Sequence, residues 1–308
     1  MSCIRCAGAH VLAGMPLEPV VLGEIARLRG LDPARDLVLD TLFLGGSSLP
    51  PALQRRLART WDARVIELYG STETMLLGTS CAQGTLHLEP ELAYCEVVDP
   101  ASGEPVTSAG DGRLVVTTMG IEGSPLVRLD TGDVVRRLPP CSCGDPRPAM
   151  LVLGRAAEIV RVAGVALHTH AVLDAAAAAA DALDSGVFFV VVLSDRLLVR
   201  IEADGGGRSG DPTPALRAAL GGMPVEIETT ARGELLDVEM LCRSPRVYKP
   251  VVLSDWTASG RRILTVVEGM IEWPRPSAAE GRRWLGRTWR RIRRARELRR
   301  TVERLPPR

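Results

Sequence analysis

The stretch Leu68-Tyr69-Gly70-Ser71-Thr72-Glu73-Thr74 directly follows the strand-like run 64–68 and decides the fold. A strand that ends in such a polar turn presents backbone amides, hydroxyls and one carboxylate at a single point. Amides and hydroxyls bind phosphate oxygens, and carboxylate oxygens are hard ligands that suit Mg²⁺. The alternative is a plain strand-to-helix turn, in which Ser71 or Thr72 caps a helix and Glu73 lies in its first turn.

A strand, a helix and a second strand are predicted around this turn. Residues 37–44 form an apolar run that ends in Gly45-Gly46, and the next segment has three large apolar residues at i, i+4 and i+8, which is typical of a helix. With the strand 64–68 this makes a parallel unit. We therefore expect Gly45-Gly46 and Tyr69-Gly70 at the carboxyl ends of neighbouring strands, where open α/β sheets bind ligands.

Short strands and then a mixed pattern follow. The predicted strands of an antiparallel, barrel-like subdomain are 93–98, 113–118, 125–128, 134–138 and 150–153. Beyond them, the predicted order is a helix at 171–183, strands at 187–193 and 196–202, a helix at 214–220 and a strand at 225–228. This order predicts a small α+β unit after the sheet.

Three segments in a fixed order resemble a known family. They are the turn at 68–74, Arg128-Leu129-Asp130-Thr131-Gly132-Asp133, and the glycine-bounded run 154–165. Together they resemble the adenylate-forming enzymes, and Cys-Ser-Cys-Gly at 141–144 narrows the resemblance to relatives of phenylacetate-CoA ligase. The resemblance covers roughly residues 17–250.

The resemblance implies a fold class of α/β plus α+β. It predicts the C-terminal part of an adenylate-forming core, with a parallel sheet unit and a β-barrel-like subdomain, and then a small lid. The expected domains are a partial core at 1–153, a lid at 154–255, and a linker with a basic amphipathic tail at 256–308.

The resemblance also implies an activity, in which ATP and a small carboxylic acid, an aryl acid in the resembled family, give an acyl adenylate. The lid then rotates and CoA displaces AMP. Thr72 would position the α-phosphate and Glu73 would hold Mg²⁺. Lys249, the only lysine in the chain, would bridge acyl and phosphate oxygens, although it lies two residues past the expected position; a solvent-facing lysine is the alternative. The residues expected to bind the nucleotide are Gly45, Gly46, Tyr69, Gly70, Ser71, Asp133 and Arg155.

Some positions depart from the family pattern. Ser47 stands where an acidic residue usually follows the glycine pair, and Ala157 stands at the hinge. Nothing between Met1 and Gly70 corresponds to the Ser/Thr/Gly-rich loop that wraps the β and γ phosphates. The expectation is a truncated ligase, a degenerate relative, or a chain that receives the loop from another polypeptide. The alternative function is a non-catalytic, zinc-stabilised module that binds nucleotide or a partner.

Cysteines and one histidine predict a metal site. The expected zinc ligands are Cys81, His87, Cys141 and Cys143. Three thiolates and one imidazole suit a closed tetrahedral structural zinc site, and some members of the resembled family carry such cysteines. Scattered buried cysteines are the alternative. Cys3, Cys6 and His10 are spaced like half of a second site, but an ordinary segment of the fold is the favoured interpretation there.

The charge distribution is uneven along the chain. Residues 276–308 hold 12 arginines against 3 glutamates, so within a net charge of +1 the rest carries −8. We expect this basic tail to dock on an acidic surface, either of this chain or of a protein partner; a membrane surface and nucleic acid are weaker alternatives, and a homodimer is a further expectation. Neither a transmembrane stretch nor a signal peptide is recognisable, which predicts a cytoplasmic protein.

Overall fold

The computed structural model describes residues 8–203, 210–238, 241, 249–257 and 263–266. The predicted basic tail and Cys3, Cys6 and Cys242 lie outside these residues. Over the described ranges, no helix combines the length and the apolar composition that crossing a bilayer requires.

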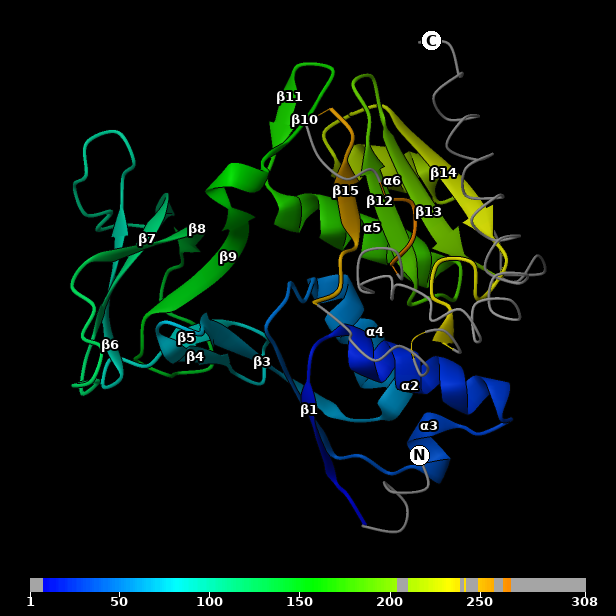
Figure 1. The fold of residues 1–308 in the computed structure, drawn as a ribbon, viewed down its shortest axis with the longest axis horizontal. Helices are drawn as coiled ribbons and strands as arrows, with labels where there is room; N and C mark the ends of the chain where they lie inside the picture. The colour runs from blue at the N-terminus through cyan, green and yellow to red at the C-terminus, as the bar shows by residue number, and fades with distance from the viewer. Residues whose placement is uncertain (1–7, 204–209, 239–240, 242–248, 258–262, 267–308) are drawn as a thin grey trace, which may run out of the picture.

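One mixed sheet of nine strands forms the larger part of the structure, in the order β1-β2-β3-β4-β5-β9-β8-β7-β6 (Figure 1). The strands are β1 (Val11–Gly14), β2 (Thr41–Gly45), β3 (Arg64–Ser71), β4 (Met75–Ser80), β5 (Leu86–Leu88), β6 (Ala93–Val98), β7 (Gly110–Thr118), β8 (Leu129–Arg137) and β9 (Ala149–Arg155). The first three run parallel, and every later pair is antiparallel. The parallel unit and the barrel-like strands are therefore parts of one continuous sheet.

Helices α2 (Leu17–Leu28), α3 (Pro33–Asp36) and α4 (Pro51–Trp61) accompany the parallel strands. Helix α4 begins at a proline, whose fixed φ suits a first helical turn, and buries the predicted apolar face. It ends at Asp62, which has a left-handed φ of 48°. Its apolar face and its start therefore follow from the local sequence.

Two predicted strands are placed wrongly, and in both cases a residue with positive φ explains the error. The strand expected at 37–44 is β2, which begins only at Thr41, because Val38 has a φ of 46° and interrupts extended backbone. The strand expected at 125–128 is absent, because φ is 50° at Arg128, and the strand expected at 134–138 is the second half of β8, which extends back to Leu129. Residues other than glycine rarely have a positive φ, so the pattern of apolar residues gives no sign of it.

A smaller unit, here called the lid, follows the large sheet. It contains the short helix η1 (Ala156–Glu158), the hairpin β10 (Val160–Val162) and β11 (Val165–Leu167), and helices α5 (Thr169–Ala182) and α6 (Thr213–Ala219). Its four-stranded sheet has the order β14-β13-β12-β15, with β12 (Phe188–Val192), β13 (Leu197–Glu202), β14 (Val225–Thr230) and β15 (Leu253–Asp255). The predicted strand-strand-helix-strand order of the lid is confirmed.

The lid lies against the helices of the parallel strands, while β6, β7 and β8 extend away on the other side (Figure 1). The larger hydrophobic core contains side chains of α2 and α4 together with side chains of α5 and the lid sheet. A smaller core fills the inner face of strands β4 to β9. The lid and the parallel strands therefore share one core.

Candidate functional site

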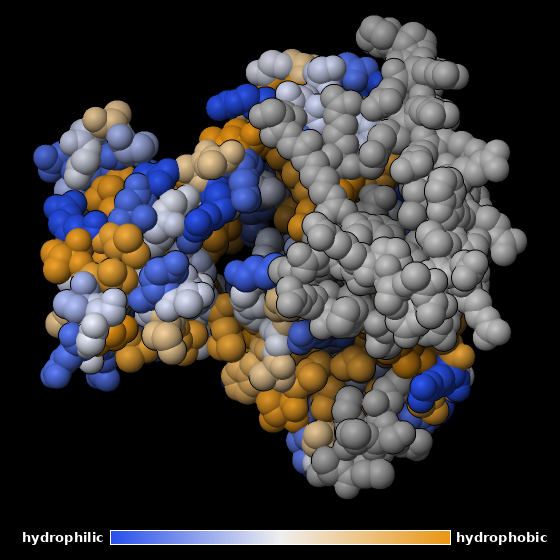
Figure 2. All heavy atoms as spheres, viewed as in Figure 1, coloured by the Kyte–Doolittle hydropathy of each residue, from blue (hydrophilic) through white to orange (hydrophobic). Residues whose placement is uncertain are grey.

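A cavity of about 1020 Å³ lies between the large sheet and the lid. Its walls come from the loop after β2, the turn between β3 and β4, strands β8 and β9, the start of α5, and residues 249–255. The space-filling view shows a hollow between the lobe of β6 to β8 and the rest, with hydrophilic side chains on its rim (Figure 2). The cavity includes the carboxyl ends of β2 and β3, where the sequence predicts a ligand site.

The glycine pair after β2 shapes one wall of the cavity. Gly45 pairs with Leu68 of β3, and a Cβ added to Gly45 would lie 2.6 Å from the Leu68 carbonyl oxygen, so no side chain fits there. Gly46 has a φ of 78° and lines the cavity with Ser47. Glycine is thus required at the two positions for separate reasons: the close approach of two strands at Gly45 and the left-handed backbone at Gly46.

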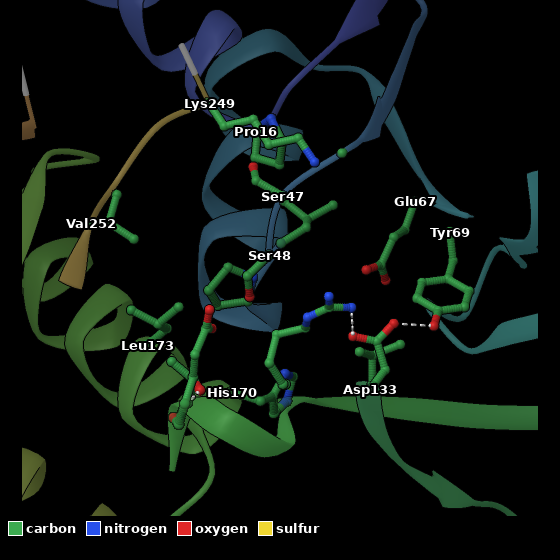
Figure 3. A pocket seen from close by; sticks show the side chains of 18 of the residues that line it. Pro16, Ser47, Ser48, Glu67, Tyr69, Asp133, His170, Leu173, Lys249 and Val252 are labelled. Carbon is green, nitrogen blue, oxygen red and sulfur yellow. Dashed lines mark hydrogen bonds and ion pairs between the residues drawn. The ribbon is translucent and has the colours of Figure 1, made fainter. Parts of the chain in front are cut away.

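Asp133 lies at the centre of a three-residue hydrogen-bond cluster. The phenol of Tyr69 donates to Oδ2 over 2.6 Å, and Arg155 donates to Oδ1 over 3.0 Å (Figure 3). Arg155 reaches this position because it pairs with Asp133 across β8 and β9, and it also donates to the Thr131 carbonyl over 2.7 Å. Burial raises the pKa of Tyr69, and the neighbouring carboxylate adds to that effect.

The motif turn is the tip of a hairpin between β3 and β4, so the alternative of a strand-to-helix turn is wrong. The Thr74 amide donates to Ser71 Oγ over 3.2 Å, which closes the turn. Thr72 and Glu73 are exposed at its tip and line the cavity. A hydrogen bond from Ser71 lowers the pKa of Glu73, and the positive charges of Arg155 and Lys249 act in the same direction. These effects favour the ionised form of Glu73.

Lys249 lies in the wall of the same cavity. Its side chain crosses the cavity beside Pro16 and Ser47, on the side opposite Tyr69 and Asp133 (Figure 3). The residues just before it, 242–248, lie outside the described part of the chain. A lysine from the lid and the motif residues of the large sheet thus line one space, although more than ninety positions separate them in the sequence.

Glu67 and His170 are among the titratable side chains of this cavity that sequence reasoning missed. Glu67 points into it from β3 beside Tyr69, and burial raises the pKa of its carboxyl group to about 7 (Figure 3). His170 enters from the first turn of α5, and burial lowers the pKa of its imidazole. Alternation along a strand could have identified Glu67, because residues 67 and 69 share a face. No local pattern marks His170, whose position depends on where the lid docks.

The predicted metal ligands come together in a second place. The ligand atoms of Cys81, His87, Cys141 and Cys143 all lie within 4.8 Å of one another. They come from the end of β4, from β5, and from the loop between β8 and β9. This loop is at the opposite end of β9 from Arg155, so the cluster is separate from the cavity.

Two separations in this cluster are close to those of a tetrahedral metal site. Zn–S bonds of 2.3 Å and Zn–N bonds of about 2.0 Å place tetrahedral ligand atoms roughly 3.5–3.8 Å apart. The sulfur atoms of Cys81 and Cys141 are 3.9 Å apart, and Cys143 Sγ is 3.4 Å from His87 Nε2. His87 Nδ1 lies 3.2 Å from the Arg147 carbonyl, which fixes Nε2 as the free ligand atom. A hydrogen bond from Thr85 lowers the pKa of Cys141 to about 6, which favours the thiolate.

Curated proteins of one name align with about half of this chain. A phenylacetate-coenzyme A ligase from Thermus thermophilus is 31% identical over 166 residues, which are 52% of this chain and 37% of that protein. Ligases of the same name from Pseudomonas putida and Aromatoleum evansii are 31% and 30% identical over 53% and 48% of this chain. The chain spans little more than a third of the length of these relatives. No protein-family profile matches it.

Solved structures show the same fold. A 2-hydroxyisobutyryl-CoA ligase in the postadenylation state, in complex with R3-HIB-AMP, superposes with a TM-score of 0.65 at 20% identity, over 82% of this chain and 56% of that chain. The same ligase with 2-HIB-AMP gives a TM-score of 0.63 over 75% of this chain and 52% of that chain. The large sheet and the lid therefore have the architecture of an adenylate-forming ligase.

Proposed function

This chain is related to the phenylacetate-CoA ligases and has the fold of the adenylate-forming ligases, and on that premise we propose that it activates a small carboxylic acid with ATP and passes the acyl group to CoA. One observation carries the proposal. Lys249 of the lid faces the same cavity as the 69–73 turn and the Asp133–Arg155 pair. An aryl acid is the proposed substrate class, in keeping with the name of the relatives.

The proposed reaction has two steps. A carboxylate oxygen of the acid attacks the α-phosphorus of ATP, and the bond to the bridging oxygen breaks, so that pyrophosphate leaves and an acyl adenylate remains. The CoA sulfur then attacks the acyl carbon, the bond to the AMP oxygen breaks, and the thiol proton passes to solvent. Each step forms one bond and breaks one, and AMP is a much better leaving group than hydroxide.

The cavity residues have separate roles in this proposal. Asp133 accepts hydrogen bonds from the ribose hydroxyls. The Arg155 guanidinium moves off Asp133 and contacts the nucleotide instead. Thr72 positions the α-phosphate, and Lys249 stabilises the charge that develops between acyl and phosphate oxygens. Glu67, on the same face of β3 as Tyr69, offers a further hydrogen-bonding group to the nucleotide (Figure 3).

Glu73 is the residue that fits a divalent cation. It is exposed to the cavity, and hydrogen bonding and nearby positive charge keep it ionised. Mg²⁺ that arrives with ATP would neutralise phosphate charge there.

We further propose that the cluster of Cys81, His87, Cys141 and Cys143 holds a structural zinc ion. The donor set, the separations and the orientation of His87 support this. The ion would join the hairpin β4–β5 to the loop between β8 and β9, and it has no part in the chemistry. The proposed compartment is the cytoplasm, where ATP, CoA and reduced thiols occur together.

Exchange of pyrophosphate into ATP by the purified 308-residue chain tests the adenylation step. A panel of aryl and short-chain acids serves as substrate, and we expect exchange only with an accepted acid. Glu73→Gln, Asp133→Ala and Lys249→Ala should each lower it by about 100-fold, because each removes charge or contact in the transition state. Glu91→Gln is the matched control, since Glu91 is exposed and outside the cavity. Absence of exchange from folded protein with every acid would contradict the proposal.

The second candidate is a non-catalytic, zinc-stabilised module that binds nucleotide or a partner. It is favoured by the state of Asp133, both of whose oxygens already accept hydrogen bonds from Tyr69 and Arg155. The same assay separates the two candidates, because this module would bind ATP in calorimetry without supporting any exchange.

A further inference from the structure

Helix α5 of the lid runs along α4, and a side chain of α5 caps the first turn of α4. Asp174 Oδ1 accepts a hydrogen bond from the Ala52 amide over 2.7 Å. Pro50, the N-cap residue of α4, has no side chain that could accept this bond. The first amides of a helix have no partner inside it, so here the lid supplies the cap that the local sequence lacks.

A second acidic residue of α5 contacts the other end of α4. Asp181 accepts from Arg56 over 2.9 Å and from Arg59 over 2.6 Å, and its side chain is only 27% exposed. Asp184 adds a longer contact to Arg56 at 3.3 Å. Burial by itself would raise the pKa of Asp181, but the hydrogen bonds from the two arginines lower it below its usual value. The carboxylate is therefore held by both cations.

The lid is also attached to α2. Arg232, which follows β14, donates to Glu24 Oε1 over 2.9 Å, and both side chains are 14% exposed. Arg232 also donates to the Asp184 carbonyl over 3.3 Å. Removing either partner of a pair this far from water would leave the other charge poorly solvated, which is costly. Two helices of the large sheet thus have charged contacts to the lid.

Between these contacts lies an apolar interface. Leu57 of α4 and Leu173 of α5 belong to one hydrophobic cluster. The alanines of α5 allow the neighbouring elements to approach closely, and Ala176 and Ala180 are almost fully buried. Moving the lid away would expose this surface to water, which opposes the movement.

The junction between sheet and lid is closely packed as well. Gly154 has a φ of 125°, and a Cβ there would lie 2.9 Å from Thr169 Oγ1 at the start of α5. The Thr169 hydroxyl donates to the Glu158 carbonyl over 2.9 Å. Ala157, at the position where the sequence predicts a hinge, lines the cavity between them. A rotation at this point has to break these contacts first.

The docked lid presents one of its faces to the cavity. Lys249 lines the cavity, whereas the hairpin tip around Gly164 does not. The hairpin β10–β11 begins near the junction of sheet and lid, and its tip projects outward from there (Figure 1). The contacts between α4 and α5 therefore hold the arrangement in which Lys249 is at the site.

We propose that the α4–α5 interface is a lid clamp, in which Asp174 and Asp181 hold Lys249 at the cavity and favour formation of the acyl adenylate over its transfer to CoA. This inference rests on the proposed two-step function for its catalytic consequence. The clamp itself is a property of the unliganded chain and does not depend on that function. Asp174 and Asp181 act in it as positioning residues.

Hydrogen-exchange mass spectrometry on the full 308-residue chain tests the clamp without any substrate. Asp181→Asn should raise the exchange rates of amides in α4 and α5 about fivefold, the factor that a loss near 1 kcal/mol implies. Glu226→Gln is the matched control, because it removes an ion pair with Arg196 inside the lid sheet and leaves the interface intact. In a double-mutant cycle with Arg59→Gln, the two changes should not be additive. Equal exchange in Asp181→Asn and the control would overturn the clamp.

The catalytic consequence is measured by following both half-reactions. Asp181→Asn should lower pyrophosphate exchange and raise the fraction of adenylate converted to CoA thioester, each about fivefold, while Glu226→Gln should change neither. An unchanged ratio of thioester to adenylate would overturn the preference for the first step. If the wild-type chain shows no pyrophosphate exchange at all, the proposed function fails. The hydrogen-exchange rates of the amides in α4 and α5 still decide whether the lid is clamped. Asp174→Asn, whose amide oxygen still accepts from Ala52, should retain most of the wild-type ratio.

Discussion

Glu67 combines a buried carboxyl group with a position beside the hydrogen-bond cluster of the cavity. Burial raises its pKa from 4.5 to about 7. Between these values the folded chain keeps a proton that the unfolded chain has released, so the free energy of unfolding falls as the pH rises through this window. The contribution of Glu67 to the free energy of unfolding is therefore less favourable at pH 8 than at pH 4.5.

Replacement of Glu67 by glutamine should remove this dependence on pH. We expect Glu67→Gln to match the wild type in urea unfolding near pH 4.5 and to exceed it by about 2–3 kcal/mol at pH 8, since each unit of pKa is worth about 1.4 kcal/mol. Glu104→Gln, at an exposed turn, is the control and should show no such difference. Equal stabilities of Glu67→Gln and wild type at pH 8 would show that the carboxylate is not destabilised by burial.

At this scale the sequence predicted the residues of the motifs better than the rest of the cavity. Tyr69, Asp133 and Arg155 could be named because each belongs to a short pattern, and the structure brings them together. That they bond to one another could not be foreseen, because it depends on the register of β8 with β9. Their roles in binding a nucleotide stay predictions.

Among the elements, the two loops with cysteines lead to a prediction about metal content. We expect the purified chain to contain about one zinc ion, measured by plasma mass spectrometry. Cys141→Ser should remove it and lower the thermal midpoint by roughly 5–10 °C, because bound metal stabilises only the folded state.

Cys95→Ser is the matched control for the zinc prediction. Cys95 lies on β6 outside the cluster, and burial raises the pKa of its thiol to about 11, which disfavours a thiolate. This variant should keep its zinc and most of its thermal stability. Metal-free wild-type protein with an unchanged midpoint after chelation would exclude a structural ion.

Helices and buried strands of this chain follow from local patterns, whereas edges and junctions do not. The apolar face of α4 is readable because its buried residues recur every four positions. Strand β1 was not predicted, because four residues of half-exposed edge strand carry little pattern. Strands β6, β7 and β9 were recognised and β8 in part, but β4 and β5 were not predicted. The fusion of the antiparallel with the parallel strands depends on these two, because it requires the pairing of β3 with β4 and of β5 with β9.

For the whole molecule, the shared core predicts cooperative unfolding. Leu173 of α5 is 4% exposed within the cluster that also contains the buried face of α4. Leu173→Ala should lower the free energy of unfolding by about 2–5 kcal/mol, the usual range for a buried leucine. Sheet and lid should still unfold in a single transition, followed by circular dichroism and tryptophan fluorescence. The control Val127→Ala, at a side chain that is 78% exposed, should change little. Two separate transitions in the wild type would contradict a common core.

The docking of the lid was beyond sequence reasoning for a physical reason. The bonds of Asp174 and Asp181 reach partners 122 to 125 residues earlier in the chain. Acidic residues seven positions apart on an alanine-rich helix look like an ordinary solvated face. Only the three-dimensional arrangement shows that this face meets two arginines and the open end of another helix.

The pair of hydrogen bonds on Asp133 has a consequence for the choice of sugar if this carboxylate binds the ribose hydroxyls as proposed. Where a buried carboxylate depends on the ligand for its partners, a ligand that lacks one hydroxyl leaves an oxygen unpaired and is rejected strongly. Here Tyr69 and Arg155 can return to the vacated oxygen. A 2′-deoxyribonucleotide would then lose only the net value of one hydrogen bond. This cavity should therefore tolerate an altered sugar far better than a site in which the protein offers the carboxylate no hydrogen-bond donors of its own.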